Sequence, residues 1–131
     1  MLHVFIIFVF SDLSAQNSFI ENKGQFPKEV KAKIDLPAGS LFIEEGRLRY
    51  AFYSSKQLSL VHDLHRANKN IEAHSYEVDF INSNTDIPTE LLEAGNYYEN
   101  YYLGHQSRWA KNVRSYKSVL QKNVYKMLEW Q

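Results

Sequence analysis

Apolar and polar residues alternate with a period of two over much of this chain, as in strands with one face on a core and one face in water. The alternation runs through residues 32–36, 47–52 and 75–80. Residues 40–43 are an apolar stretch, residues 44–46 can form a turn, and further turn-forming residues separate the other stretches. We therefore predict a hairpin over residues 40–53 that leaves Arg47 and Arg49 in solvent. The residues that it buries are Leu41, Ile43, Leu48, Tyr50 and Phe52.

Two segments depart from this alternation. Residues 53–70 are mostly polar and predict a long connection, with a short edge element at Leu58, Leu60 and Val61. A helix is expected only over Thr89–Ala94, where Thr89 can cap its start and Gly95 can end it.

Several short strands bounded by turns must stack two faces to bury their apolar sides. We predict an all-β, mainly antiparallel, sandwich-like domain with at most one or two short helices. A partly closed barrel is the alternative. In either case Phe52→Ala is expected to cost roughly 3–5 kcal/mol of stability.

The N-terminus has the pattern of a secretory signal peptide. Residues 4–10 are apolar, residues 13–15 read Leu-Ser-Ala, and seven apolar residues are far fewer than the roughly 20 that span a bilayer. The sequence thus predicts a signal peptide over residues 1–15, no transmembrane anchor, and a secreted or cell-surface protein. Residues 1–3 lack Lys and Arg, and the alternative is a buried N-terminal strand.

Composition limits the partners. The chain has 15 basic and 15 acidic residues, and removing residues 1–15 takes away Asp12 and no basic residue, which leaves 15 and 14. A charge so near zero gives no field that concentrates a polyanion, so nucleic acid is not expected as a partner. Residues 16–131 suit one domain, and without cysteine its stability must come from its core.

Catalytic patterns are sparse. The chain has no cysteine nucleophile, no Gly-x-Ser-x-Gly elbow and no glycine-rich phosphate loop. Glu77 and Asp79 share one face of a predicted strand at a spacing that suits glycoside chemistry, but strand alternation alone produces such pairs. We interpret them as surface residues and predict no catalytic residues, no cofactor and no enzyme. A hydrolase fragment is the weaker option.

Three histidines lie close in sequence. His62 and His65 have a shorter spacing than zinc sites usually use, and His74 follows nearby. A polar loop seldom preorganises metal ligands, so no metal site is predicted.

The aromatic residues near the C-terminus are the best candidates for binding. Flat rings with polar edges stack on sugars and bury much area, although most large aromatic residues serve in packing, which is the favoured interpretation. Both strand and helical spacing fit this segment, since Tyr98, Tyr102 and His105 lie at the helical positions i, i+4 and i+7. The candidate ligand-binding residues are Tyr97, Tyr98, Tyr101, Tyr102 and Trp109.

Four basic residues recur every three positions in the same region. This spacing indicates a wet helical face or a loop rather than a polyanion site. They are Arg108, Lys111, Arg114 and Lys117.

A structural turn is predicted at Asn22, Gly24 and Pro27. Asn22 can bond to its own main chain, Gly24 supplies backbone freedom, and Pro27 restricts the next segment. Phe19 and Phe26 flank the turn, as expected for a chain entry held against a sheet.

Five phrases in a fixed order carry a family resemblance over about residues 19–125. They are residues 19–26 (FIENKGQF), the strand pair at 41–43 and 48–52, residues 73–80 (AHSYEVDF), residues 100–104 (NYYLG) and residues 109–116. Together they resemble the uncharacterised N-terminal β-rich domain of large Bacteroidetes cell-surface proteins of the gliding-motility-associated and SBBP-repeat kind.

The resemblance implies an exported, non-enzymatic module followed in relatives by repeats and a sorting domain for type IX secretion. The chain departs from such relatives after Val124-Tyr125, where Lys126-Met127-Leu128 replaces further strands. We therefore expect a C-terminally truncated fragment with an open sheet edge, and poor solubility or self-association of the isolated product.

Two function classes stay open. The first is a structural or interaction module of an exported surface protein, with adhesion or gliding motility as its role and protein or surface polysaccharide as its partner. The second is a carbohydrate-binding module that uses the aromatic residues. An exposed coplanar pair of these rings would favour the second class, and their burial the first.

Overall fold

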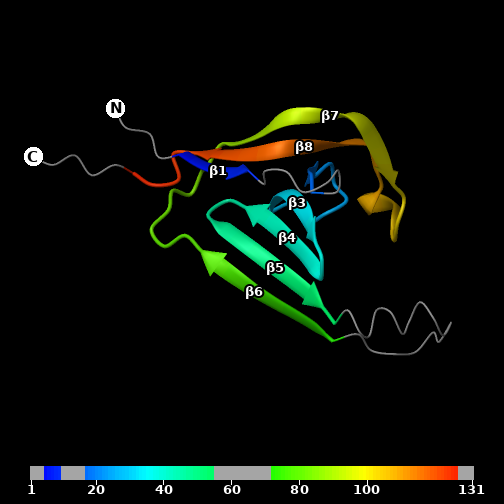
Figure 1. Ribbon diagram of the computed structural model, residues 1–131, viewed down its shortest axis with the longest axis horizontal. Coiled ribbons are helices and arrows are strands. Elements are labelled where there is room, and N and C mark those ends of the chain that lie inside the picture. The colour runs from blue at the N-terminus through cyan, green and yellow to red at the C-terminus, as the bar shows by residue number, and fades with distance from the viewer. Residues whose placement is uncertain (1–4, 10–16, 55–71, 127–131) are drawn as a thin grey trace, which may run out of the picture.

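The computed structural model describes residues 5–9, 17–54 and 72–126 of the chain, and it is all-β as predicted. This part of the chain contains eight strands and a single 3₁₀ turn, and Figure 1 shows how they are arranged. The elements are β1 (Phe5–Val9), β2 (Phe19–Glu21), β3 (Val30–Leu36), β4 (Gly39–Glu44), β5 (Arg47–Tyr53), β6 (Ala73–Asp79), β7 (Thr89–Tyr101), η1 (Gln106–Arg108) and β8 (Ala110–Lys122).

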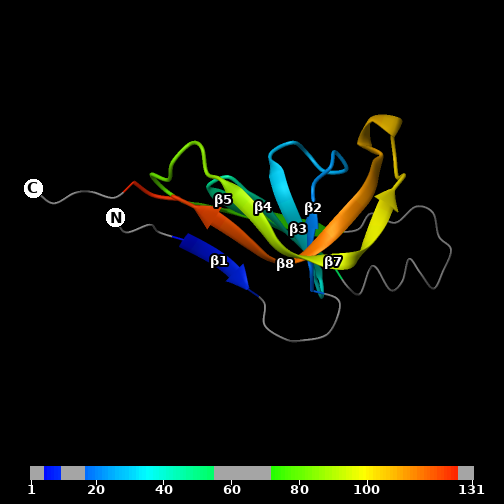
Figure 2. The same cartoon turned by 90° about the horizontal axis from the view of Figure 1, so that it is seen from above.

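One antiparallel sheet contains all eight strands, in the order β1-β8-β2-β3-β4-β5-β6, with β7 also paired to β8. Strands β1 and β2 follow one another along one edge of β8, and β7 occupies its other edge. Among the described strands β6 pairs only with β5, so the sheet does not close into the alternative barrel. Figure 2 shows how strongly β7 and β8 cross the direction of β2–β5.

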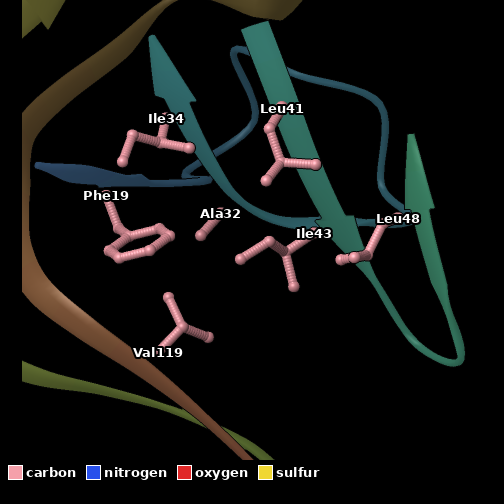
Figure 3. Packing of buried hydrophobic residues seen from close by; sticks show 7 residues of the cluster. All are labelled: Phe19, Ala32, Ile34, Leu41, Ile43, Leu48 and Val119. Atoms are coloured by element: carbon pink, nitrogen blue, oxygen red, sulfur yellow. The ribbon is translucent and has the colours of Figure 1, made fainter. Parts of the chain in front are cut away.

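The core lies where the coiled sheet faces itself, in a sandwich-like arrangement. Val119 of β8 packs against apolar residues of β2, β3, β4 and β5, and Figure 3 shows these side chains pointing toward one another. The cluster consists of Phe19, Ala32, Ile34, Leu41, Ile43, Leu48 and Val119.

The predicted hairpin is β4 and β5, joined at Glu45–Gly46. Leu41, Ile43 and Leu48 are buried as expected. Tyr50 and Phe52 are only half-buried, because the part of the inner face that they occupy lies beside the wholly exposed strand β6. The predicted loss of unfolding free energy for Phe52→Ala, roughly 3–5 kcal/mol, is therefore too large.

The helix expected over Thr89–Ala94 is wrong, because this segment forms the first half of β7. Its residues suit a helix by intrinsic preference, but pairing with β8 gives hydrogen-bond partners to the backbone groups that face β8 and buries part of Leu91. Gly95 does not end a helix. It lies where β7 and β8 approach closely, since a Cβ there would meet Ser115 Oγ at 2.8 Å.

Irregular pairing bends the β7–β8 hairpin. The register shifts between Ala94 and Tyr98 and again between Glu99 and Tyr101, and Glu93 and Asn112 have positive φ. Bulges of this kind increase the local twist and re-aim side chains. They carry the far end of the hairpin away from β3–β6 (Figures 1 and 2).

Candidate binding surface on the β7–β8 hairpin

The aromatic candidates lie mainly on the outside of the hairpin. Tyr97 is 87% exposed, and Tyr98, Tyr102 and Trp109 are also exposed, while Tyr101 is half-buried. The favoured interpretation of these rings as core packing is therefore wrong for four of the five. Their segment is strand with one 3₁₀ turn, so the helical spacing of Tyr98, Tyr102 and His105 has no structural role.

The exposed rings do not form a coplanar pair. Tyr102 and Trp109 meet edge to face, with centroids 5.4 Å apart and an interplanar angle of 84°. Near-parallel rings occur elsewhere, on the inner face of β5 and β6, where Tyr50 and Tyr76 stack at 4.9 Å and 17°. The sequence hints at this stack, because Tyr50 and Tyr76 each occupy an inward position of an alternating segment, but their cross-strand register comes only from the structure.

A groove of about 330 Å³ lies between β2, β3 and the half of the hairpin that is nearer to its connecting turn. Tyr97 and Tyr101 line it together with groups that hydrogen-bond strongly. These residues are Asp35, Glu99, Arg114 and Ser115. Sequence reasoning missed Asp35 and Glu99, because no local pattern brings β3 next to β7.

Several of these groups have existing partners. The Tyr101 hydroxyl donates to Glu99 Oε2 at 3.1 Å, and Asp35 pairs with Lys33 at 2.6 Å. Arg114 makes no side-chain ion pair within the described ranges, although its main-chain N–H donates to Glu21 at 2.8 Å. The groove thus offers an exposed ring, a free cation and partly engaged carboxylates.

The turn at Asn22 is held together by hydrogen bonds of the Asn22 side chain. Asn22 Oδ1 accepts from the N–H groups of Gly24 and Phe26, while Nδ2 donates to the carbonyls of Phe26, Pro27 and Val30. Gly24 has φ +108°, a value that L side chains rarely adopt.

Two side chains of this turn reach the hairpin. The Phe26 ring contacts both Phe42 and Tyr101 edge to face, at 6.1 and 6.4 Å between centroids. Lys23 Nζ donates to the carbonyl of Asn112 at 2.8 Å. The turn therefore connects the start of the sheet to both strands of the hairpin.

The recurring basic residues are not on a helix. Arg108 lies in η1, and Lys111, Arg114 and Lys117 lie on β8, where odd spacings alternate between the two faces of the strand. All four are exposed, so they form a wet surface as predicted but no single stripe.

Glu77 and Asp79 lie on one face of β6, as the alternation predicted. Both bind Arg47, with N–O distances of 3.1 and 2.5 Å, and Glu77 also meets Arg49 at 3.2 Å. This arrangement is a solvated ion-pair network, in which each pair contributes little to stability.

Histidines do not form a site in the described part of the chain. His74 is exposed on β6, and His62 and His65 lie outside the described residues, as does the edge element expected at 58–61. Over residues 5–9, 17–54 and 72–126, no group of three His, Cys, Asp or Glu could hold a metal ion. The same residues contain no helix that is long and apolar enough to cross a membrane.

The hydroxyl of Tyr101 gives the groove a pH-dependent signature. Burial, the charge of Glu99 and the hydrogen bond to it raise the pKa of Tyr101 to about 12, against about 10 for tyrosine in an unfolded chain. Because the folded state holds this proton more tightly, Tyr101 adds stability below pH 10 that is lost as the pH rises from about 10 to about 12.

We expect the free energy of unfolding of the wild type to fall relative to that of Tyr101→Phe across this pH range. Urea unfolding of both proteins at a series of pH values measures the difference. Parallel pH profiles would contradict the assignment.

A protein-family model, described as a domain of unknown function (DUF7948), matches residues 19–131. The chain belongs to this DUF7948 family. No curated protein and no solved structure matches it. The match begins at Phe19, the first residue of β2, so the DUF7948 domain includes the turn at Asn22, the hairpin and all of the groove except Ser18, and leaves β1 outside.

Proposed function

We propose that this DUF7948 domain is a non-catalytic interaction module of an exported bacterial cell-surface protein, with a role in adhesion or gliding motility. The observation that carries the proposal is the exposure of large apolar side chains on a projecting hairpin. Tyr97 is 87% and Leu103 80% exposed, with Tyr98, Tyr102 and Trp109 beside them. Exposed aromatic groups of this kind are typical of surfaces that bind a partner.

Export is supported by the sequence of the N-terminus. Residues 4–15 have the apolar stretch and small-residue exit of a signal peptide. Phe5–Val9 also pairs with β8 as strand β1, which is the alternative use of the same apolar residues. The two uses predict different mature N-termini.

Sequencing the N-terminus of material from a bacterial host that expresses the full chain tests the proposal. The expected result is an exported product that begins at Gln16. A protein retained inside the cell, or an intact Met1 on exported material, would contradict the signal peptide and with it the surface role.

Carbohydrate binding is a second candidate, favoured by the composition of the groove. A sugar ring can stack on the exposed Tyr97 while its hydroxyls bond to Asp35, Glu99 and Arg114. A polar rim around one accessible ring is an arrangement that suits a neutral polysaccharide.

Titration calorimetry with a panel of soluble neutral polysaccharides tests this second candidate. For a polysaccharide that binds, Tyr97→Ala is expected to weaken affinity about tenfold or more. Tyr53→Ala, a change of an exposed tyrosine on β5 that does not line the groove, is the matched control. Failure of the wild type to bind any member of the panel, or equal losses in both variants, would reject sugar binding at the groove.

A further inference from the structure

Among the described strands, β6 lies at an edge of the sheet. Within the described part of the chain it pairs only with β5, and all seven of its residues are exposed. A free edge displays a row of unpaired N–H and C=O groups that can bind another strand.

The hydrogen-bond pattern tells which backbone groups of β6 face outward. Phe80 N–H donates to the Gly46 carbonyl at 2.8 Å, and Ser54 N–H donates to the Glu72 carbonyl at 3.1 Å. Hydrogen-bonded and non-hydrogen-bonded pairs alternate along an antiparallel ladder. Gly46–Phe80 and Ser54–Glu72 are hydrogen-bonded pairs. Tyr50–Tyr76 lies four residues from each of them in the same register, so it is a hydrogen-bonded pair as well. Within residues 5–9, 17–54 and 72–126, the outward-facing groups that have no partner strand belong to Ala73, Ser75, Glu77 and Asp79.

The negative charges of β6, which could prevent pairing with another strand, are neutralised by arginines of the same chain. Glu77 and Asp79 would repel a second acidic strand, but Arg47 binds both and Arg49 binds Glu77. On the other face of β6, Tyr76 is 52% and Val78 42% exposed. Tyr76 is also the outermost ring of the stack that it forms with Tyr50 and Phe52.

We propose that two copies of the chain pair antiparallel along β6, with the two-fold axis at Tyr76. Ala73 then lies opposite the second copy's Asp79, and Ser75 opposite its Glu77. All four outward-facing residues of each strand find partners, which gives about eight hydrogen bonds across the dimer.

Other registers are worse for identifiable reasons. Moving the axis to residue 77 places Glu77 opposite Glu77 of the second copy, and like charges directly opposite destabilise a sheet. Moving it to residue 75 leaves Asp79 without a partner strand. Only the axis at Tyr76 continues the aromatic stack from one copy into the other while keeping acidic residues opposite neutral ones.

Cysteine cross-linking tests both the dimer and its register, because the chain has no cysteine of its own. Tyr76 on the axis is a non-hydrogen-bonded pair with Cα atoms about 4.5 Å apart, within the range that a disulfide bridges. The full chain with Tyr76→Cys is expected to form a disulfide-linked dimer under mild oxidation. Tyr97→Cys, an exposed position on the hairpin, is the matched control and should cross-link at least tenfold more slowly.

Light scattering on the full-length wild type and on Ser75→Pro provides the second arm. Proline removes an outward-facing N–H and leaves the ladder to β5 intact, as edge strands tolerate. We expect a wild-type dimer whose dissociation constant rises about tenfold or more in Ser75→Pro. A wild type that stays monomeric at high micromolar concentration, or cross-linking of Tyr76→Cys no faster than that of Tyr97→Cys, would overturn the proposal, and the second outcome does so even if the proline variant fails to fold.

Discussion

Replacing Phe19 by alanine is expected to lower the free energy of unfolding by about 3–5 kcal/mol. Phe19 is fully buried, and its strand position lies between Ile34 on β3 and Tyr116 on β8. It also belongs to the cluster in which Val119 packs against β2–β5 (Figure 3). The loss is a large share of the roughly 5–15 kcal/mol that stabilises a typical domain, and urea unfolding measures it.

Phe52→Ala is the matched control for this prediction. Phe52 is half-buried and contacts Tyr50 and Tyr76 at the uncovered end of the sheet, so we expect a loss of about 1–2 kcal/mol. Equal losses in the two variants would show that the core does not lie around Phe19.

Asn22→Asp is expected to cost about 2–4 kcal/mol although it changes hardly any volume. The amide Nδ2 donates to the carbonyls of Phe26, Pro27 and Val30, and a carboxylate oxygen in its place would face three acceptors without a proton to give. The same turn holds Phe26 against Tyr101, so the groove should loosen as well. Urea unfolding at pH 7, where the new carboxylate is charged, measures the loss.

Gln25→Glu is the isosteric control for the turn. Gln25 Nε2 makes one such bond, to the carbonyl of Glu21, so its replacement should cost about 1 kcal/mol. If Asn22→Asp unfolds at the wild-type midpoint, the five bonds of Asn22 do not hold the turn.

The self-association that we propose involves a particular edge of the sheet. The sequence predicts an open edge near the C-terminal residues. In the structure β8, which precedes them, pairs with β7 on one side and with β1 and β2 on the other, and cleavage after Ala15 would remove β1. Among the described strands β1, β6 and β7 each pair with a single neighbour, and the sequence identifies β6 as a strand but cannot place it at the end of a sheet.

The candidate binding surface was also only partly predictable from the sequence. The sequence picks out Tyr97, Tyr98, Tyr101, Tyr102 and Trp109 as a group, but the same residue types suit a core or a surface. Only the bulged β7–β8 pairing exposes most of these rings, and only the neighbouring β3 supplies Asp35 to the groove.

The sequence by itself determined the strands whose one face is buried. In β4 and β5 the period of two places Leu41, Ile43 and Leu48 inside, because a strand slipped by one residue would expose them all. The turn residues between these strands act locally, so the hairpin boundaries were also predictable.

Tertiary structure decided the elements whose local preferences are weak or misleading. Thr89–Ala94 has the residues of a short helix, yet it is a strand because β8, more than twenty residues further along the chain, provides its hydrogen-bond partners. Phe19 is fully buried because β8 packs over its part of the sheet, whereas Phe52 is half-buried because it lies beside the exposed strand β6. Long-range pairing and coverage arise only when distant segments meet, so no window of the sequence contains them.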